Sequence, residues 1–147
     1  MDGILNTHLR HIVWTLDLSA ILAIENASFH KPWNLCDFYK FMLKSSSLGR
    51  VTVHNGEVIG YLLYEKHENR LHVAHVAVKS DYRNRGLGRE MLRSLGEPTQ
   101  VNVTLNVRRS NVRAQRLYHI LGFDVVQVLP AHYCDGEDAF LMGYRAF

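Results

Sequence analysis

The hydrophobic positions along the chain follow two periods, which predict a mixture of strands and helices. Strands are expected where apolar residues alternate or run together and β-branched residues are frequent, at residues 11–14, 50–54, 58–64, 71–78, 101–107, 125–129 and 139–144. Helices are expected where apolar residues recur every three or four positions, at residues 15–28, 34–42, 87–95 and 111–121. Asn55-Gly56 lies between two strands and is typical of a type I′ hairpin. These elements predict a mixed α/β (α+β) fold whose sheet is not entirely parallel.

Polar residues and a proline predict where the helices begin and end. Thr15 or Asp17 is expected to cap the first helix, Asn34 to open the second and Asn111 to cap the fourth. Pro98 helps to end the third. The buried faces of the first two helices are expected to consist of Leu18, Ile21, Leu22, Leu35, Phe38, Tyr39 and Met42.

The stretch from residue 71 to residue 95 reads as a buried strand, a basic loop with two glycines and a helix. Main-chain N–H groups at such a turn converge near the positive end of the helix dipole and attract phosphate. A glycine also lets a bulky anion approach the backbone. The residues of the loop that serve this purpose are Arg83, Arg85, Gly86, Gly88 and Arg89. An ordinary strand-to-helix turn is an equal alternative, and the spacing fits neither a dinucleotide fingerprint nor a P-loop.

Three segments carry a resemblance to a known family. Residues 76–89, V-A-V-x-x-x-Y-R-x-R-G-L-G-R, resemble the acetyl-coenzyme A (acetyl-CoA) signature of the GNAT (GCN5-related) N-acetyltransferase superfamily. Residues 111–123 are similar to its N-x-x-A-x-x-L-Y-x-x-x-G-F motif. Residues 133–142 resemble the tail of ribosomal-protein-alanine N-acetyltransferases. The resemblance implies one GNAT domain over residues 1–147, with a mixed, mostly antiparallel twisted sheet of six to seven strands and about four helices.

The resemblance also implies how acetyl-CoA is held. The central strand should splay from its neighbour, so that N–H groups near its end bind the pantetheine arm and the thioester oxygen. The loop that follows should hold the pyrophosphate, and Asn111 the arm. The expected cofactor-binding residues are Val76, Ala77, Val78, Arg83, Asn84, Arg85, Gly86, Leu87, Gly88, Arg89 and Asn111.

Acetyl transfer to an amine needs a proton donor for the leaving thiolate and a proton acceptor for the amine. Tyr118 matches the family tyrosine that protonates the thiolate, although a packed aromatic residue is the other interpretation. Asn106 stands where the ribosomal-protein-alanine enzymes carry a glutamate, and an amide takes no proton at pH 7. His72 lies at a position that carries the base in other GNAT branches, and a solvent-facing strand residue is an equal alternative. His75, three residues on, is expected on the opposite face.

The acceptor side is expected to include Trp33, Asn106 and Tyr133, with Glu137 and Asp138 lining the groove. A turn is an equal alternative for Asp135, Gly136 and Glu137. A peptide α-amine has a pKa near 7.7–8.0, so roughly a tenth of it is neutral at pH 7, whereas lysine is almost wholly charged. A site without a strong base therefore favours a protein or peptide N-terminus. A small-molecule amine and a catalytically weak CoA-binding module are the alternatives.

Composition and charge agree with this interpretation. The 147 residues are 47% hydrophobic and 21% charged, which is ordinary for a globular domain. The net charge of +3 and the clustered arginines fit nucleic acid or a polyphosphate ligand. The adjacent glycine loop favours the second, so no nucleic-acid partner is expected.

Other features of the sequence indicate where the protein works. The two cysteines are far apart and form no metal-binding spacing with the histidines, so free thiols and no metal are expected. No apolar run approaches the roughly 18 residues of a membrane helix, and residues 1–11 lack a signal-peptide core. A cytoplasmic monomer or dimer without a membrane partner is the expectation.

Overall fold

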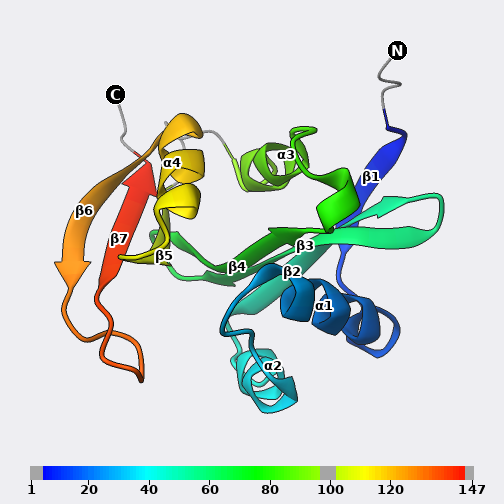
Figure 1. Cartoon of the computed structure of the whole chain (residues 1–147). Helices are drawn as coiled ribbons and strands as arrows, with labels where there is room; N and C mark the ends of the chain where they lie inside the picture. Colours follow the sequence, from blue (N-terminus) through cyan, green and yellow to red (C-terminus); the bar gives the residue numbers. More distant parts are fainter. Residues whose placement is uncertain (1–4, 97–101, 145–147) are drawn as a thin grey trace.

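The seven strands found in residues 5–96 and 102–144, which the computed structural model describes, form one sheet (Figure 1). The strands are β1 (Thr7–His11), β2 (Ser47–His54), β3 (Glu57–Lys66), β4 (Leu71–Val78), β5 (Val103–Arg108), β6 (Phe123–Leu129) and β7 (Ala139–Tyr144). Their order is β1-β2-β3-β4-β5-β7-β6, and β4–β5 is the single parallel pair among them. The mixed, mostly antiparallel sheet is therefore confirmed.

Helices cover both faces of the sheet. They are α1 (Trp14–Ser28), α2 (Leu35–Met42), α3 (Leu87–Arg93) and α4 (Val112–Ile120), with a short 3-10 turn η1 (Ser80–Tyr82) after β4. In Figure 1, α1 and α2 lie below the sheet, and α3 and α4 lie above it. Each pair encloses its own apolar cluster, with Ile21 and Phe38 below and Met91 and Phe123 above. The four expected helices are confirmed.

The N-terminal elements begin earlier than predicted. The first strand is Thr7–His11 instead of residues 11–14, because it pairs with β2 from Thr7↔His54 to His11↔Arg50 despite its polar sequence. Val13 is the N-cap residue of α1 and makes no side-chain capping bond, so the predicted cap at Thr15 or Asp17 is wrong. Asp17 lies inside the helix instead, where its carboxylate accepts hydrogen bonds from the Val13 N–H (2.8 Å) and from Arg10 (2.7 and 2.8 Å).

Helix α2 begins where predicted but buries a narrower face. Asn34 and Asp37 form a capping box, in which each side chain accepts the other residue's main-chain N–H at 2.9 Å. Phe38 and Phe41 are buried, whereas Leu35 and Tyr39, which were expected in the core, are about half exposed. The helix contacts the apolar cluster along one edge, and its other apolar positions face outward.

The other differences are shifts of strand ends. Strand β2 starts at Ser47, and β5 covers Val103–Arg108. The predicted start of that strand at Val101 and the predicted helix stop at Pro98 lie outside the described residues. The Asn55-Gly56 hairpin is confirmed, because φ is positive at both residues (51° and 77°).

The buried Asp17 carboxylate provides a test of how α1 is fixed to β1. Its hydrogen bond with Arg10 lowers the pKa of Asp17, so the ionised form stabilises the fold at neutral pH. We expect Asp17→Asn to reduce the free energy of unfolding by about 2 kcal/mol at pH 7 in urea titrations. This difference should shrink as the pH falls through the lowered pKa of Asp17, below about 4. The exposed Asp81→Asn serves as the control, and an equal loss in both variants would contradict the assignment.

Candidate active site

The site lies where strands β4 and β5 separate. The two strands pair from Leu71↔Val103 to Val73↔Leu105, and in the described residues no pairing continues beyond that point. On its other edge β4 remains paired with β3 up to Gly60↔Val78. The β5-facing edge of residues 74–78 is thus free of a strand partner. Main-chain groups on such an edge are available to a ligand, as the sequence predicts for Val76, Ala77 and Val78.

A cavity of about 570 Å³ occupies this separation. Its walls include Val73, Val76 and Tyr118, which pack with the upper apolar cluster, and Phe29 and Trp33, which pack with the lower one. The cavity therefore opens on both faces of the sheet, and its volume suits a small ligand or an extended segment.

The glycine loop turns directly from β4 into α3. Asn84 (φ 62°) and Gly86 (φ 80°) adopt the left-handed conformation. A Cβ atom added at Gly86 or at Gly88 would meet no atom within 4 Å, so open space lies above both. Arg83 is already engaged, because it donates to the Val78 carbonyl (2.9 Å) and to Ser28 Oγ (3.0 Å).

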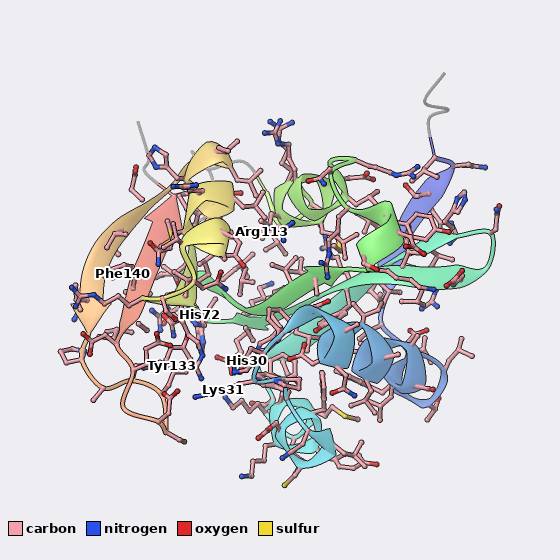
Figure 2. The ribbon with its side chains drawn as sticks, in the orientation of Figure 1. His30, Lys31, His72, Arg113, Tyr133 and Phe140 are labelled. Carbon is pink, nitrogen blue, oxygen red and sulfur yellow. The ribbon has the colours of Figure 1, made fainter. Side chains whose placement is uncertain are left out.

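The remaining residues of this loop differ in accessibility. Arg85 and Arg89 are exposed at the turn, and Leu87 is buried beneath it. The loop thus presents main chain and two exposed guanidinium groups to an anion, of which Arg85 also contacts the Asp81 carbonyl (3.5 Å) and the Tyr82 ring, while Arg83 positions the loop itself. Arg113 of α4, on the same side of the sheet, lies between α4 and α3 (Figure 2).

Helix α4 supplies the upper wall of the cavity. Asn111 is its N-cap, and the side-chain oxygen accepts the Ala114 N–H at 3.1 Å. The amide nitrogen of Asn111 stays available, and the residue lines the cavity. Tyr118 also lines it and packs edge-to-face on Phe123. Burial, followed by the nearby Tyr133, raises the pKa of Tyr118 to about 12, so its phenol stays protonated and can donate at neutral pH.

A β-bulge places two histidines of β4 on the same face. Leu63 pairs with His75 and Tyr64 with Val73, so Ala74 is the extra residue of the bulge. His72 and His75 both line the cavity, and His75 contacts Phe29 and Trp33 below the sheet. The prediction that His75 lies on the opposite face from His72 is therefore wrong, because the bulge shifts the alternation by one residue.

His72 lies against β5. Its Nδ1 is 2.7 Å from Thr104 Oγ1, and Figure 2 shows the ring on the side of Tyr133 and Lys31. Burial, followed by the charge of Arg70, lowers the pKa of His72, so the imidazole is neutral at pH 7. The neighbouring Asn106 amide nitrogen is 3.4 Å from His132 Nε2. Its amide oxygen is buried, with no hydrogen-bond partner in the described part of the chain.

A buried carboxylate behind the cavity was not identified from the sequence. Glu25 of α1 is fully buried and accepts hydrogen bonds from the Trp33 N–H (3.0 Å) and from the Tyr61 hydroxyl. Its Oε1 is also 3.0 Å from His75 Nδ1. The Trp33 and His75 rings lie 4.0 Å apart between centroids. The helical period could have found Glu25, because it lies four residues after the buried Ile21, but a glutamate is seldom expected in a core.

The loop between β6 and β7 forms the opposite wall. The Arg108 guanidinium lies over the Tyr133 ring at 3.9 Å and pairs with Asp135 (3.0 Å) and Glu137 (2.9 Å). Lys31, from the loop after α1, reaches across to Asp135, and these donors hold the pKa of Asp135 well below its ordinary value. Tyr133 and Lys31 line the cavity, and Figure 2 shows them on one side of it.

The two acidic residues expected in the groove have other partners. Glu137 also accepts the Ser110 N–H at 3.2 Å. Asp138 pairs with Arg109 (3.1 Å) and accepts the Ala131 N–H (2.9 Å). Neither is among the described residues that line the cavity, so the groove-lining interpretation of both is wrong. Glu137 follows the turn at residues 133–136, and its N–H donates to the Asp135 carboxylate at 3.2 Å.

Comparisons with known proteins agree with this geometry. The family model of the acetyltransferase (GNAT) family matches residues 18–123. The chain belongs to the acetyltransferase (GNAT) family. It is 34% identical to an uncharacterized N-acetyltransferase of Methanocaldococcus jannaschii, with 86% of this chain and 84% of that one covered. It is 32% identical to an N-alpha-acetyltransferase of Sulfurisphaera tokodaii, with 86% of each covered.

A solved structure gives the same result. The ribosomal-protein-S18-alanine N-acetyltransferase of Escherichia coli superposes with a TM-score of 0.80 at 28% identity, covering 94% of this chain and 92% of that one. The expected GNAT fold is thereby confirmed, and the protein is an N-acetyltransferase whose acetyl donor is acetyl-CoA. The open space above Gly86 and Gly88 and the unpaired edge of β4 fit such a donor.

Arg108 should determine whether the β6–β7 loop is ordered. We expect Arg108→Ala to raise amide hydrogen exchange in residues 131–138 at least about tenfold, because it removes a cation–π contact and two ion pairs. The global free energy of unfolding should change by less than about 1 kcal/mol, since these groups are partly exposed. Arg109→Ala, which removes one exposed ion pair and a longer cation–π contact with Phe140 (5.9 Å), is the control. Equal exchange in the two variants would show that Arg108 does not organise the loop.

Proposed function

We propose that the protein transfers the acetyl group of acetyl-CoA to the N-terminal α-amine of a protein or peptide. The observation that supports this most directly is the cavity through the separated strands. It brings the free edge of β4, Asn111 and Tyr118 together with Trp33 and Tyr133. A donor entering from above and an amine entering from below would meet between these walls, in a ternary complex.

On the donor side, the main chain of the protein does most of the binding. The freed N–H groups of residues 76–78 bind the pantetheine arm and polarise the thioester carbonyl. The turn at residues 83–89 holds the pyrophosphate through main-chain N–H groups, Arg85 and Arg89, with Arg83 fixing the turn. The free amide nitrogen of Asn111 donates to the arm. Acetyl-CoA supplies an acetyl group already activated as a thioester.

Tyr118 donates its proton to the departing sulfur, a role that its place in the cavity wall supports, while its raised pKa keeps the phenol protonated until the thiolate forms. His72 remains the candidate that the sequence assigns to accept the proton of the amine, since it lines the cavity and is neutral at pH 7. Asn106, with a buried and unpartnered oxygen, holds the amine or a water instead of taking a proton.

The acceptor assignment rests on chemistry and on two relatives. An α-amine is partly neutral at pH 7, so it depends less on a strong base than a lysine amine does. The acids of the β6–β7 loop are paired with arginines or Lys31, and Glu65 on the cavity wall is paired with Lys44, so these carboxylates offer little free negative charge to draw in a lysine side chain. The Sulfurisphaera tokodaii relative is an N-alpha-acetyltransferase, and the Escherichia coli structure is that of a ribosomal-protein-alanine enzyme. Trp33 and Tyr133 supply aromatic walls for the first residues of a peptide.

No helix in residues 5–96 and 102–144 is long and apolar enough to span a membrane. The cytoplasmic location and the monomeric or dimeric state remain predictions from the sequence.

Two glycines with the same backbone conformation give a matched test of donor binding. Gly86 (φ 80°) and Gly56 (φ 77°) are both in the left-handed region with open space around them, so a side chain strains each to a similar degree. We expect Gly86→Glu to weaken acetyl-CoA binding at least about tenfold in calorimetry, because it places a carboxylate where the pyrophosphate binds. Gly56→Glu, in the β2–β3 hairpin, should leave the affinity unchanged. Similar affinities of the two variants for acetyl-CoA would show that the pyrophosphate does not bind at this loop.

An acceptor panel tests the proposed reaction itself. We expect peptides with a free N-terminus to be acetylated with a kcat/KM at least about a hundredfold above that of N-terminally blocked peptides containing lysine, because few lysine amines are neutral at pH 7. Small amines, such as polyamines and amino acids, complete the panel, and mass spectrometry locates the acetyl group. Faster turnover of a small amine would identify a small-molecule enzyme. Binding of acetyl-CoA without turnover of any amine would identify a CoA-binding module.

A further inference from the structure

We propose that His75, oriented by Glu25, is the group that accepts the proton of the acceptor amine. This inference rests on the proposed acetyl transfer and names a residue that the family resemblance did not assign. His75 lines the cavity, and its side chain is 16% exposed. Glu25 behind it is fully buried.

The hydrogen bonds of Glu25 assign the state of the ring. A carboxylate accepts hydrogen bonds, and the donors converging on Glu25 are the Trp33 N–H, the Tyr61 hydroxyl and His75 Nδ1. Burial, followed by the charge of Glu25, raises the pKa of Tyr61 far above its ordinary value, so that hydroxyl keeps its proton. His75 therefore donates to Glu25 through a proton on Nδ1, and in the neutral ring the lone pair is on Nε2.

The surroundings fix the ring and support a charge on it. Trp33 at 4.0 Å and Phe29 at 5.3 Å between centroids hold its orientation. A carboxylate bonded to one nitrogen also stabilises the positive charge that the ring gains when the other nitrogen takes a proton. His72 lacks this support, because its Nδ1 meets a neutral threonine hydroxyl that can donate or accept.

The ring stands among other ionisable groups. Glu25 comes from α1 and Tyr61 from β3, and His72 lies on the same face of β4. The further ionisable residues on the cavity walls are Lys31, Asp37, Lys40, Lys44, Glu65, Arg108, Tyr118, His132 and Tyr133. Of the described histidines that line the cavity, His75 is the one whose ring is hydrogen-bonded to a fully buried carboxylate, that of Glu25.

Each proton and electron pair in the reaction has a destination. His75 Nε2 takes one proton from the ammonium and later releases it to solvent. The freed nitrogen pair forms the C–N bond, and the C–S bond breaks with its electron pair left on sulfur. Tyr118 gives its proton to that sulfur, and the second proton lost by the nitrogen restores the phenol. The products are the amide, CoA thiol and one released proton.

The test measures kcat/KM for a free-N-terminus peptide between pH 6 and pH 9.5 in wild type, His75→Gln, Glu25→Gln and the exposed His11→Gln. We expect His75→Gln to lose about a hundredfold at pH 7, and the loss to shrink toward pH 9.5, where the α-amine deprotonates unaided. Glu25→Gln should lose about tenfold, and both variants should keep the wild-type affinity for acetyl-CoA. His11→Gln should match the wild type.

A His75→Gln variant within threefold of wild type at pH 7 would overturn the proposal. So would a loss of equal size at every pH, which is what a purely structural role predicts. If the wild type acetylates small amines but not peptides, the proposal of a peptide acceptor is wrong. The same variants, measured with the small amine as substrate, would then still test whether His75 accepts the proton.

A second measurement uses only the wild-type protein, so it does not depend on whether a variant folds. Nitrogen-15 NMR of the wild-type imidazoles, with the ring of His75 assigned through its contact with Trp33, should show the proton on Nδ1 and none on Nε2. A proton on Nε2 would overturn the proposal, because that nitrogen could not then accept one.

Discussion

The site depends on the separation of two neighbouring strands, β4 and β5, in the middle of the sheet. Strands β4 and β5 are parallel neighbours for three residue pairs and then diverge, which deprives residues 74–78 of a partner on one edge. Unpaired main-chain groups inside a protein are costly unless something satisfies them. Here they border a cavity that opens on both faces of the sheet. The same divergence therefore creates the donor-binding edge and the passage through which an amine can reach it.

The bulge at Ala74 lies at the point of divergence and has a second effect. It turns His75 to the same face as His72, and so brings an imidazole beneath the opening, next to the buried Glu25. Helix α1 can present Glu25 there because Asp17 and Arg10 fix the beginning of that helix to β1. One backbone irregularity thus links the fold of the N-terminal half to the chemistry expected at the centre of the sheet.

Charge on the acceptor side is largely compensated. Arg108, Arg109 and Lys31 pair with the three acids of the β6–β7 loop, and Arg108 also covers Tyr133. This loop and the loop after α1 are joined across the cavity by the Lys31–Asp135 pair. Exposed pairs of this kind contribute little to global stability, but they determine where the aromatic walls lie.

Features encoded by neighbouring residues were predictable from the sequence, and features that depend on distant contacts were not. The glycine turn, the Asn55-Gly56 hairpin, the Asn34 helix start and the Asn111 cap each depend on a few consecutive residues, and the structure has all four. The bulge at Ala74 was not predicted, because residues 71–78 contain no glycine or proline that would mark it. The burial of Glu25 and the pairing of Glu137 with Arg108 arise from segments far apart in the chain. The inner face of α2 was mistaken because periodicity alone does not say how much of an apolar stripe is covered.

The most direct test of a passage joining the two binding sites is the affinity of a peptide covalently linked through its N-terminus to CoA. In calorimetry, we expect this conjugate to bind about a hundredfold more tightly than CoA alone, because one molecule occupies both walls of the cavity. A structure of the complex should place the linking atoms between β4 and β5. A conjugate that binds no more tightly than CoA would show that no peptide site adjoins the donor site, and would contradict the account.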